Sequence, residues 1–311
     1  MTDIDRLIDR VDTLIGRLER LVPPAPEPTD WSAGAFRWRT RQGRGWLQAL
    51  ASPQRIDPAD LLCLERQRAE IDRNTRQFLE GRGANNLLLW GSRGTGKSSL
   101  VKAVFNAYRE RGLRLVEVDR DDLGDLPEIL DLVRLRPERF ILFCDDLSFE
   151  VGEAGYKALK AALEGSISAT PDNLLIYATS NRRHLMPEFQ AENREARLVD
   201  GELHHGESVE EKIALSDRFG LWIAFHPFTQ AQYLTLVRHW CARLGAAADD
   251  WEPVERAALQ WALRRGSRSG RTAWQFARDW AGRGPAAASD EVGERPSAEP
   301  MADDDKPHSR Q

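Results

Sequence analysis

The segment that most constrains the fold of this chain is Gly91-Ser92-Arg93-Gly94-Thr95-Gly96-Lys97-Ser98. It fits G-x-x-x-x-G-K-[ST] at every fixed position, which is the pattern of a phosphate-binding P-loop, also called Walker A. Its glycines allow the backbone to turn N–H groups toward phosphate oxygens, and a helix after the loop adds the positive end of its dipole. The segment therefore predicts a site for nucleotide phosphates.

The sequence on either side of the loop has the order that a P-loop requires. Residues 86–90 are a short, mainly apolar run, as expected of a buried parallel strand, and the apolar residues of 99–108 fall on one face of a helix. In this setting Lys97 would reach the β- and γ-phosphates and the Ser98 hydroxyl would hold Mg²⁺. Ser99 completes the predicted phosphate site. A chance match in a glycine-containing turn is the alternative.

A second apolar run, Phe140–Cys144, is followed at once by Asp145 and Asp146. A central strand that delivers two carboxylates to its C-terminal end beside a P-loop has the Walker B arrangement. We expect Asp145 to hold Mg²⁺, directly or through water, and Asp146 to orient or deprotonate the attacking water. Glu150 is a second candidate for the base, and an ordinary polar strand end is the alternative for both aspartates.

Three further runs are strand-like, at 113–118, 174–179 and 221–225. Strands that alternate with helical segments predict an α/β fold, with a parallel sheet of about five strands in a three-layer α/β/α arrangement. Asn181 follows the run at 174–179, so we expect it beside Walker B, where a polar group can touch the γ-phosphate and the water.

Helices are expected between these strands, and only helices after residue 229. Asp57 as N-cap and Pro58 at N1 form a natural start for the first helix, and Thr229 with Gln232 forms a capping box for a later one. Besides the helix at 99–108, the helices predicted in the sheet domain lie at 61–79, 121–135, 156–164 and 208–216. A charged, irregular surface insertion is expected at 189–207.

The chain is predicted to have five parts. These are an amphipathic heptad helix at 1–22, a linker with an Arg/Trp segment at 23–50, a nucleotide-binding α/β domain at 51–227, a helical lid domain at 228–282 and a disordered tail at 283–311. Three heptads are marginal alone, so the first helix pairs with a copy of itself or docks on the body.

Arginines alternate with aromatic residues between Phe36 and Trp46. One interpretation is a patch that stacks bases and contacts phosphate, so that nucleic acid is a possible partner. The other is an edge segment in which Trp38 and Trp46 pack on the body while the arginines stay in water.

The composition excludes several classes of protein. A net charge of −5 argues against a globally basic nucleic-acid binder, though not against a local basic patch. The chain has three cysteines without zinc-site or disulfide spacing, which favours the cytoplasm. No apolar run approaches the ~20 residues of a membrane span, and the first residues do not resemble a signal peptide, so no membrane association is expected.

Taken in order, these motifs resemble the AAA-plus ATPase superfamily. The resemblance places sensor 1 at Asn181, an arginine finger at Arg218 within Asp217-Arg218-Phe219-Gly220, and sensor 2 at Arg271 in the lid. More closely, residues 145–150, 178–185 and 267–271 look like the bacterial family called domain of unknown function 815. The resemblance covers roughly residues 50–282.

The resemblance implies ATP and Mg²⁺ as cofactors, a homo-oligomer with its site at a subunit interface, and an unidentified protein partner whose conformation changes on hydrolysis. There are two departures from the superfamily. Asp146 stands where many members have Glu, which implies slow turnover, and residues 119–125 lack the aromatic-glycine pair of protein-threading members.

Three functions compete. The first is an oligomeric, Mg²⁺-dependent ATPase, the second is a nucleotide-dependent scaffold or switch with little hydrolysis, and the third is a P-loop kinase acting on a small molecule. A kinase would need an acceptor pocket and an arginine-rich lid inserted within the sheet, whereas here the helical domain follows the sheet. The ATPase is therefore the first hypothesis.

Overall fold

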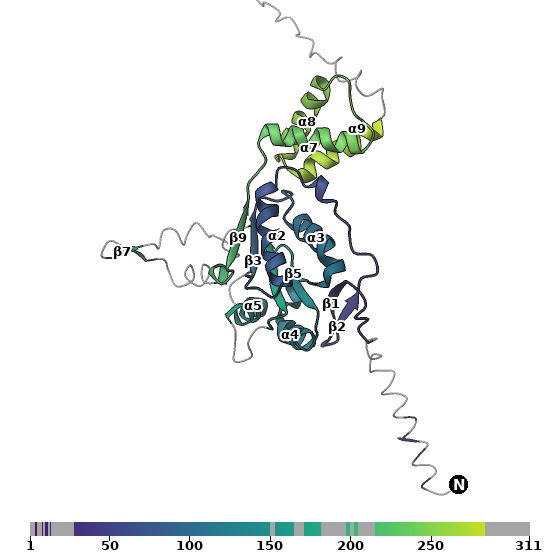
Figure 1. The fold of residues 1–311 in the computed structure, drawn as a ribbon, viewed down its shortest axis with the longest axis vertical. Helices are drawn as coiled ribbons and strands as arrows, with labels where there is room; N and C mark the ends of the chain where they lie inside the picture. The colour runs from purple at the N-terminus through teal and green to yellow at the C-terminus, as the bar shows by residue number, and fades with distance from the viewer. Residues whose placement is uncertain are drawn as a thin grey trace, which may run out of the picture.

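The computed structural model describes residues 28–149, 153–164, 171–181 and 215–283, the backbone of 197–199 and 202–204, and Ile4, Ile8, Arg10, Val11 and Thr13. A sheet with helices on both faces carries a group of three helices at one end (Figure 1). The predicted heptad helix at 1–22, the predicted helix at 208–216, Glu150 and the tail from residue 284 lie wholly or mostly outside the described residues.

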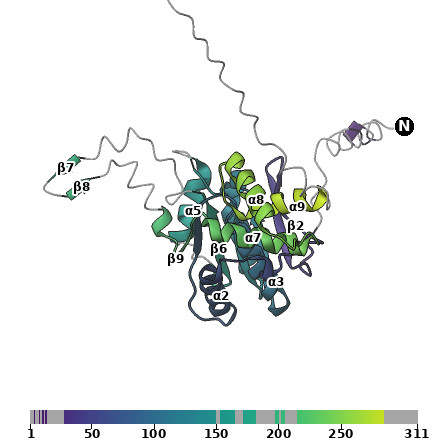
Figure 2. The same ribbon diagram turned by 90° about the horizontal axis from the view of Figure 1, so that it is seen from above.

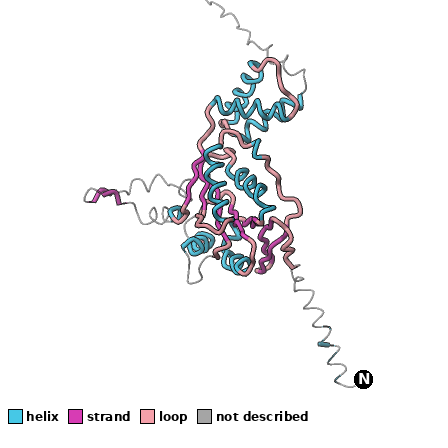
Figure 3. Tube along the Cα trace, viewed as in Figure 1, coloured by secondary structure: helices cyan, strands magenta, loops and turns pink. Residues whose placement is uncertain are grey.

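The main sheet has seven strands in the order β2-β1-β4-β5-β6-β3-β9, and its magenta trace runs through the body in Figure 3. All five strands predicted from apolar runs are present, and they pair in parallel, so the α/β prediction is confirmed. The strands are β1 (Ala35–Arg41), β2 (Arg44–Ala49), β3 (Leu87–Gly91), β4 (Leu113–Val118), β5 (Arg139–Cys144), β6 (Leu174–Ser180) and β9 (Leu221–Phe225). Within the predicted insertion, β7 (Arg197–Val199) pairs with β8 (Glu202–His204).

The Arg/Trp segment is part of the sheet, which corrects the prediction of a linker across 23–50 and raises the strand number from five to seven. β1 and β2 form an antiparallel hairpin, and β1 pairs in parallel with β4. The turn is made by Gln42 and Gly43, both with positive φ. Trp38 is fully buried and its Nε1 donates to Asp125 at 3.0 Å, whereas Arg41 and Arg44 are exposed. The alternation of arginine with aromatic residues is thus the two-residue period of a strand.

Helices cover both faces of the sheet, because successive side chains along each buried strand point to opposite faces. On β5, Ile141 and Phe143 face a core shared with α2 and α3, while Phe140 and Leu142 face a second core shared with α4 and α5. The helices are α2 (Glu65–Leu79), α3 (Lys97–Tyr108), α4 (Leu126–Arg134) and α5 (Ala154–Glu164), with short 3₁₀ turns η2 (Arg109–Arg111) and η3 (Arg120–Asp125). The three-layer arrangement follows directly.

The start of α2 differs from its prediction. Asp57 does cap a helix, because its side chain accepts a hydrogen bond from the Ala59 N–H, but that helix is only the 3₁₀ turn η1 (Pro58–Asp60). The chain then leaves helical geometry, with Cys63 at a φ of 61°, and α2 begins at Glu65. The intervening residues form a strap that runs beside the P-loop.

The lid consists of α7 (Gln230–Arg243), α8 (Glu252–Arg265) and α9 (Gly270–Arg283). The capping box of Thr229 and Gln232 is confirmed at the start of α7. Lid residues such as Tyr233 and Phe276 join the same core as α2 and α3, and the view from above places the lid over the sheet domain (Figure 2). Within the described parts of the chain, we find no helix with both the length and the apolar character to cross a bilayer.

Candidate functional site

The P-loop follows β3 and holds a backbone that only glycine tolerates at its first position. Gly91 has a φ of 130°, and a Cβ there would lie 2.0 Å from the Phe225 carbonyl oxygen on β9. The loop is fixed by the Ser92 N–H, which donates to that same carbonyl at 3.1 Å, and by the Thr95 hydroxyl, which donates to the Ser92 carbonyl at 2.8 Å. α3 then starts at Lys97, so the N-terminus of that helix opens onto the loop.

Lys97 is buried, with 7 % of its surface exposed. Its Nζ donates to the carbonyls of Gly91 and Ser92 at 2.8 Å each and to Asn181 Oδ1 at 3.1 Å. Burial is the main cause that lowers its pKa to about 8, against the opposing attraction of Asp146 and Asp145. The protein alone therefore compensates only partly for the burial of the ammonium. An anionic phosphate bound beside it would stabilise the charged form further.

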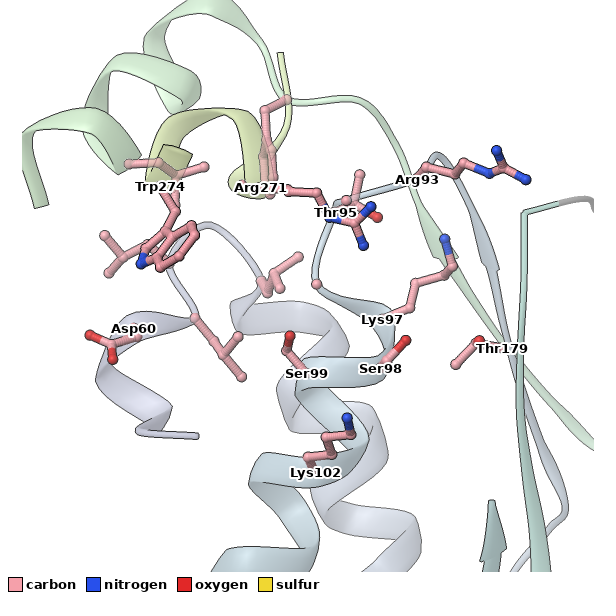
Figure 4. Close-up of a pocket in the computed structure, with 18 of the residues that line it drawn as sticks. Asp60, Arg93, Thr95, Lys97, Ser98, Ser99, Lys102, Thr179, Arg271 and Trp274 are labelled. Carbon is pink, nitrogen blue, oxygen red and sulfur yellow. The ribbon is translucent and has the colours of Figure 1, made fainter. Parts of the chain in front are cut away.

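Three oxygen-bearing side chains from separate elements meet beside Lys97. Asp145 follows β5, and its Oδ1 accepts from the Ser98 hydroxyl at 2.6 Å and from the Thr179 hydroxyl at 2.6 Å. Figure 4 shows the Ser98 hydroxyl directed toward Thr179. Mg²⁺ prefers oxygen ligands, and the Ser98 hydroxyl at the start of α3 and the Asp145 carboxylate after β5 lie within hydrogen-bond distance of each other, so these two residues fit the ion.

Asp146 and Asn181 lie next to this group. Asp146 has a φ of 53°, in the left-handed region, and its N–H donates to Thr179 Oγ1 at 2.8 Å. The Asn181 amide donates to Asp146 Oδ1 while its own oxygen accepts from Lys97. One asparagine therefore contacts both the lysine and the second carboxylate. Glu150, the other candidate base, lies outside the described residues.

The lid closes over the P-loop through the start of α9. The Arg271 N–H donates to the Gly94 carbonyl at 3.3 Å, and a Cβ on Gly94 would lie 2.9 Å from Ser269 Oγ. The Arg271 side chain reaches from the lid toward the P-loop near Thr95 (Figure 4). Between lid and loop lies a cavity of about 790 Å³, lined by Arg93, Gly94, Thr95, Gly96, Lys97, Ser98, Ser99, Asp145, Asp146, Asn181 and Arg271 among others.

Sequence reasoning missed part of this cavity. Thr179, Asp60 and Trp274 line it, the last two on the side away from Lys97 (Figure 4). Asp60 accepts from His239 Nε2 at 2.8 Å and from Arg243 Nε at 3.1 Å, which joins η1 to α7. No local signal marks Asp60 or Trp274, because their place depends on how the lid folds back. Thr179 was visible only as the last residue of an apolar run.

Among the predicted site residues that the structure describes, Arg218 lies apart from the cavity, at the opposite end of the strands from its own P-loop. It precedes β9, whose first residue Leu221 lies opposite Leu87, the first residue of β3. The P-loop follows the other end of β3, so a strand length of about 13 Å, at ~3.3 Å per residue, separates the two ends. Arg218 forms an ion pair with Glu164, the last residue of α5.

Solved structures show which fold this is. The AAA domain of FIGL-1 in complex with ADP is 18% identical and superimposes with a TM-score of 0.50 over 77% of each chain. The Holliday junction branch migration motor RuvB of Thermotoga maritima is 15% identical, with a TM-score of 0.44 over 72% of this chain and 61% of that one. The chain thus spans less than two thirds of the RuvB chain. At these identities the likeness concerns the fold alone, which is that of an AAA-plus P-loop domain.

No curated protein matches the chain. The model of the family described as "Protein of unknown function (DUF815)" matches residues 32–284, which is well over half of the chain and includes the β1–β2 hairpin, the sheet domain and the lid. The protein therefore belongs to the DUF815 family.

Proposed function

We propose that the protein is a Mg²⁺-dependent ATPase that couples hydrolysis to a conformational change in a protein partner. The observation that carries the proposal is the contact of Asn181 with both Lys97 and Asp146 at the wall of the cavity. A phosphate-binding cation, a carboxylate and a polar group that touches both are what hydrolysis of a terminal phosphoryl group requires.

Binding depends on the P-loop backbone and Lys97. The N–H groups of the loop and the N-terminus of α3 would surround the phosphates, and the Lys97 ammonium would exchange the carbonyls of Gly91 and Ser92 for the β- and γ-phosphate oxygens. Arg271 would add a second cation from the lid, so that phosphate binding and lid position are coupled.

Hydrolysis depends on the residues at the ends of β5 and β6. Ser98 and Asp145 would hold Mg²⁺, which neutralises developing charge on the phosphoryl oxygens. Asp146 would orient the attacking water and take its proton, and Asn181 would hold the water against the γ-phosphate. We infer that Arg218 acts in a neighbouring subunit's site, since it lies at the opposite end of the strands from its own P-loop.

A nucleotide-dependent scaffold with little hydrolysis is the second candidate. It is supported by the identity of Asp146, because an aspartate stands where many AAA-plus members have the longer glutamate, which places the carboxylate farther from the attacking water. In that case binding of ATP, rather than its cleavage, would set the position of the lid.

Single-turnover phosphate release from ATP with no added acceptor separates the two candidates. An ATPase releases phosphate stoichiometrically, and Lys97→Ala protein binds no ATP and releases none. Binding without release over many hours favours the scaffold. Nucleotide affinity of Lys97→Ala protein within about twofold of wild type would contradict both, because a charge-assisted contact in a buried site contributes far more than that.

A further inference from the structure

Thr179 occupies a buried place between the two carboxylates and the core. It is the sixth residue of β6 and is 1 % exposed. β6 pairs with β5 so that Ala178 lies opposite Cys144, which brings Thr179 level with Asp145. Its hydroxyl donates to Asp145 Oδ1 at 2.6 Å and accepts from the Asp146 N–H at 2.8 Å. Both capacities of one hydroxyl are thus used on adjacent aspartates.

The same residue anchors the chain beyond the aspartates. The Leu147 N–H donates to the Thr179 carbonyl at 2.7 Å, and the Ser180 hydroxyl donates to the Leu147 carbonyl at 2.8 Å. Thr179 therefore supplies three of the four hydrogen bonds named here between the end of β6 and residues 145–147. Leu147 is fully buried, which fixes the far end of this short loop.

The conformation of Asp146 depends on this anchoring. A φ of 53° is uncommon for residues other than glycine, and Asp and Asn adopt it more readily than Glu because of their short polar side chains. In this conformation the Asp146 N–H points at Thr179 while its carboxylate faces the cavity. The left-handed turn accounts for an aspartate here, since a glutamate would lack that local preference.

We propose that Thr179 is a positioning residue that holds Asp145 in the geometry for Mg²⁺ and Asp146 in the geometry for the attacking water. The inference rests on the proposed function for its consequences in turnover. It assigns to Thr179 no contact with substrate. Its effect passes through Asp145, whose hydroxyl partners Ser98 and Thr179 set the direction of its oxygens, and through the backbone of Asp146.

The test is Thr179→Val, which keeps the shape and removes the hydroxyl, against Thr179→Ser, which keeps the hydroxyl. Thr75→Val is the matched control, because Thr75 is also fully buried with two hydroxyl hydrogen bonds, to the Ile71 carbonyl and to Tyr177 Oη. The first readout is the Mg²⁺ concentration at which a non-hydrolysable fluorescent ATP analogue is half-maximally bound. The affinity of the same analogue for the protein is also measured in EDTA, which removes Mg²⁺. The second is amide hydrogen exchange of residues 145–149 in nucleotide-free protein.

Thr179→Val should raise the Mg²⁺ requirement and lower the single-turnover rate by about 10–100-fold, the usual range for loss of a partner of a metal ligand. Affinity for the analogue in EDTA should stay within about twofold of wild type, and amide exchange at 145–149 should rise. Thr179→Ser should restore the Mg²⁺ requirement, the single-turnover rate and the exchange to wild-type values. An unchanged Mg²⁺ requirement with unchanged exchange overturns the proposal. So does a loss of affinity in EDTA equal to that in Mg²⁺, which would indicate general damage. Exchange is measured without nucleotide, so failure of the proposed ATPase in wild type leaves this part of the test intact.

Discussion

The two ends of the sheet differ in whether the side chains of one chain gather around a shared cavity. At the carboxyl end, Lys97, Asp145 and Asn181 come from three elements and contact one another or shared neighbours around the cavity. At the amino end, Arg218 is paired with Glu164 of the same chain and faces no part of that cavity among the described residues.

Folding of one chain is enough to form the cavity at the carboxyl end, whereas a catalytic role for Arg218 would require assembly with a second subunit. The proposed phosphate site is assembled within one chain, because the register of β3, β5 and β6 brings the P-loop, Asp145 and Asn181 to one edge of the sheet. The Arg218 end is satisfied within one chain, so a role in catalysis requires that Arg218 leave Glu164 for an anion on another subunit. A partly exposed ion pair contributes under ~1 kcal/mol, which a phosphoryl group can readily replace.

Arg218→Ala tests the amino end and carries the largest expected effect. Turnover should fall by about 10³-fold, at the lower end of the range known for arginine fingers, while ATP affinity stays within about twofold. Mixing with Lys97→Ala protein should restore part of the activity, since an intact P-loop then meets an intact Arg218 from another subunit. Full activity of Arg218→Ala protein alone, or rates strictly linear in protein concentration for dilute wild type, would show that each chain is a complete site.

Asp146→Asn tests the carboxyl end. The amide keeps the side-chain shape and the hydrogen bond of the Asp146 backbone, but it cannot accept the proton of water, so turnover should fall by about 10²-fold with binding unchanged. Rapid-mix phosphate release measures this, with the exposed Asp121→Asn as control. If Asp146→Asn hydrolyses normally and Glu150→Gln does not, the base lies on Glu150.

Arg271→Ala tests whether the lid belongs to the carboxyl end. Arg271 contacts Gly94 through its backbone and lines the cavity with its side chain. Loss of one charged hydrogen-bond donor should weaken ATP binding by about tenfold. Arg264→Ala on the exposed surface of α8 is the matched control and should have no effect. Equal behaviour of the two variants in an equilibrium binding titration would make Arg271 an ordinary surface arginine.

How much the sequence predicts also differs between the two ends. The P-loop, both aspartates and Asn181 were predicted together because each follows a recognisable apolar run, and parallel strands bring such ends together. The pairing of Arg218 with Glu164 was not predictable, since 54 residues separate them and no local pattern couples an exposed arginine to a helix end.

The sequence of the β1–β2 hairpin carries a local pattern typical of two strands and a tight turn, although the segment was not predicted as strands. Phe36 and Trp38 alternate with arginines at the period of a strand, and Gln42-Gly43 supplies the two positive φ angles of the turn. The segment was grouped with the linker at 23–50, although one of its two interpretations was an edge segment in which Trp38 packs on the body, as it does. Thr179 shows the converse limit, because its role follows from register with β5 that no single strand reveals.

The last prediction concerns the protonation of Lys97, which should make ATP binding at the carboxyl end of the sheet depend on pH. Burial lowers the pKa of Lys97 to about 8, below the ordinary 10.5 of lysine, and the unfolded chain therefore binds more protons between those two values. Without nucleotide, the contribution of Lys97 to the free energy of unfolding should rise as pH increases from about 8 to about 10. Bound phosphates favour the charged form, so ATP affinity should fall over the same window, by about tenfold at pH 9 relative to its low-pH limit. Chemical denaturation at several pH values tests the rise in stability, with Lys97→Ala as the reference in which the rise is absent. ATP affinity measured at the same pH values tests the opposite trend. A flat affinity from pH 7 to pH 9.5 would mean that Lys97 stays charged in the free protein.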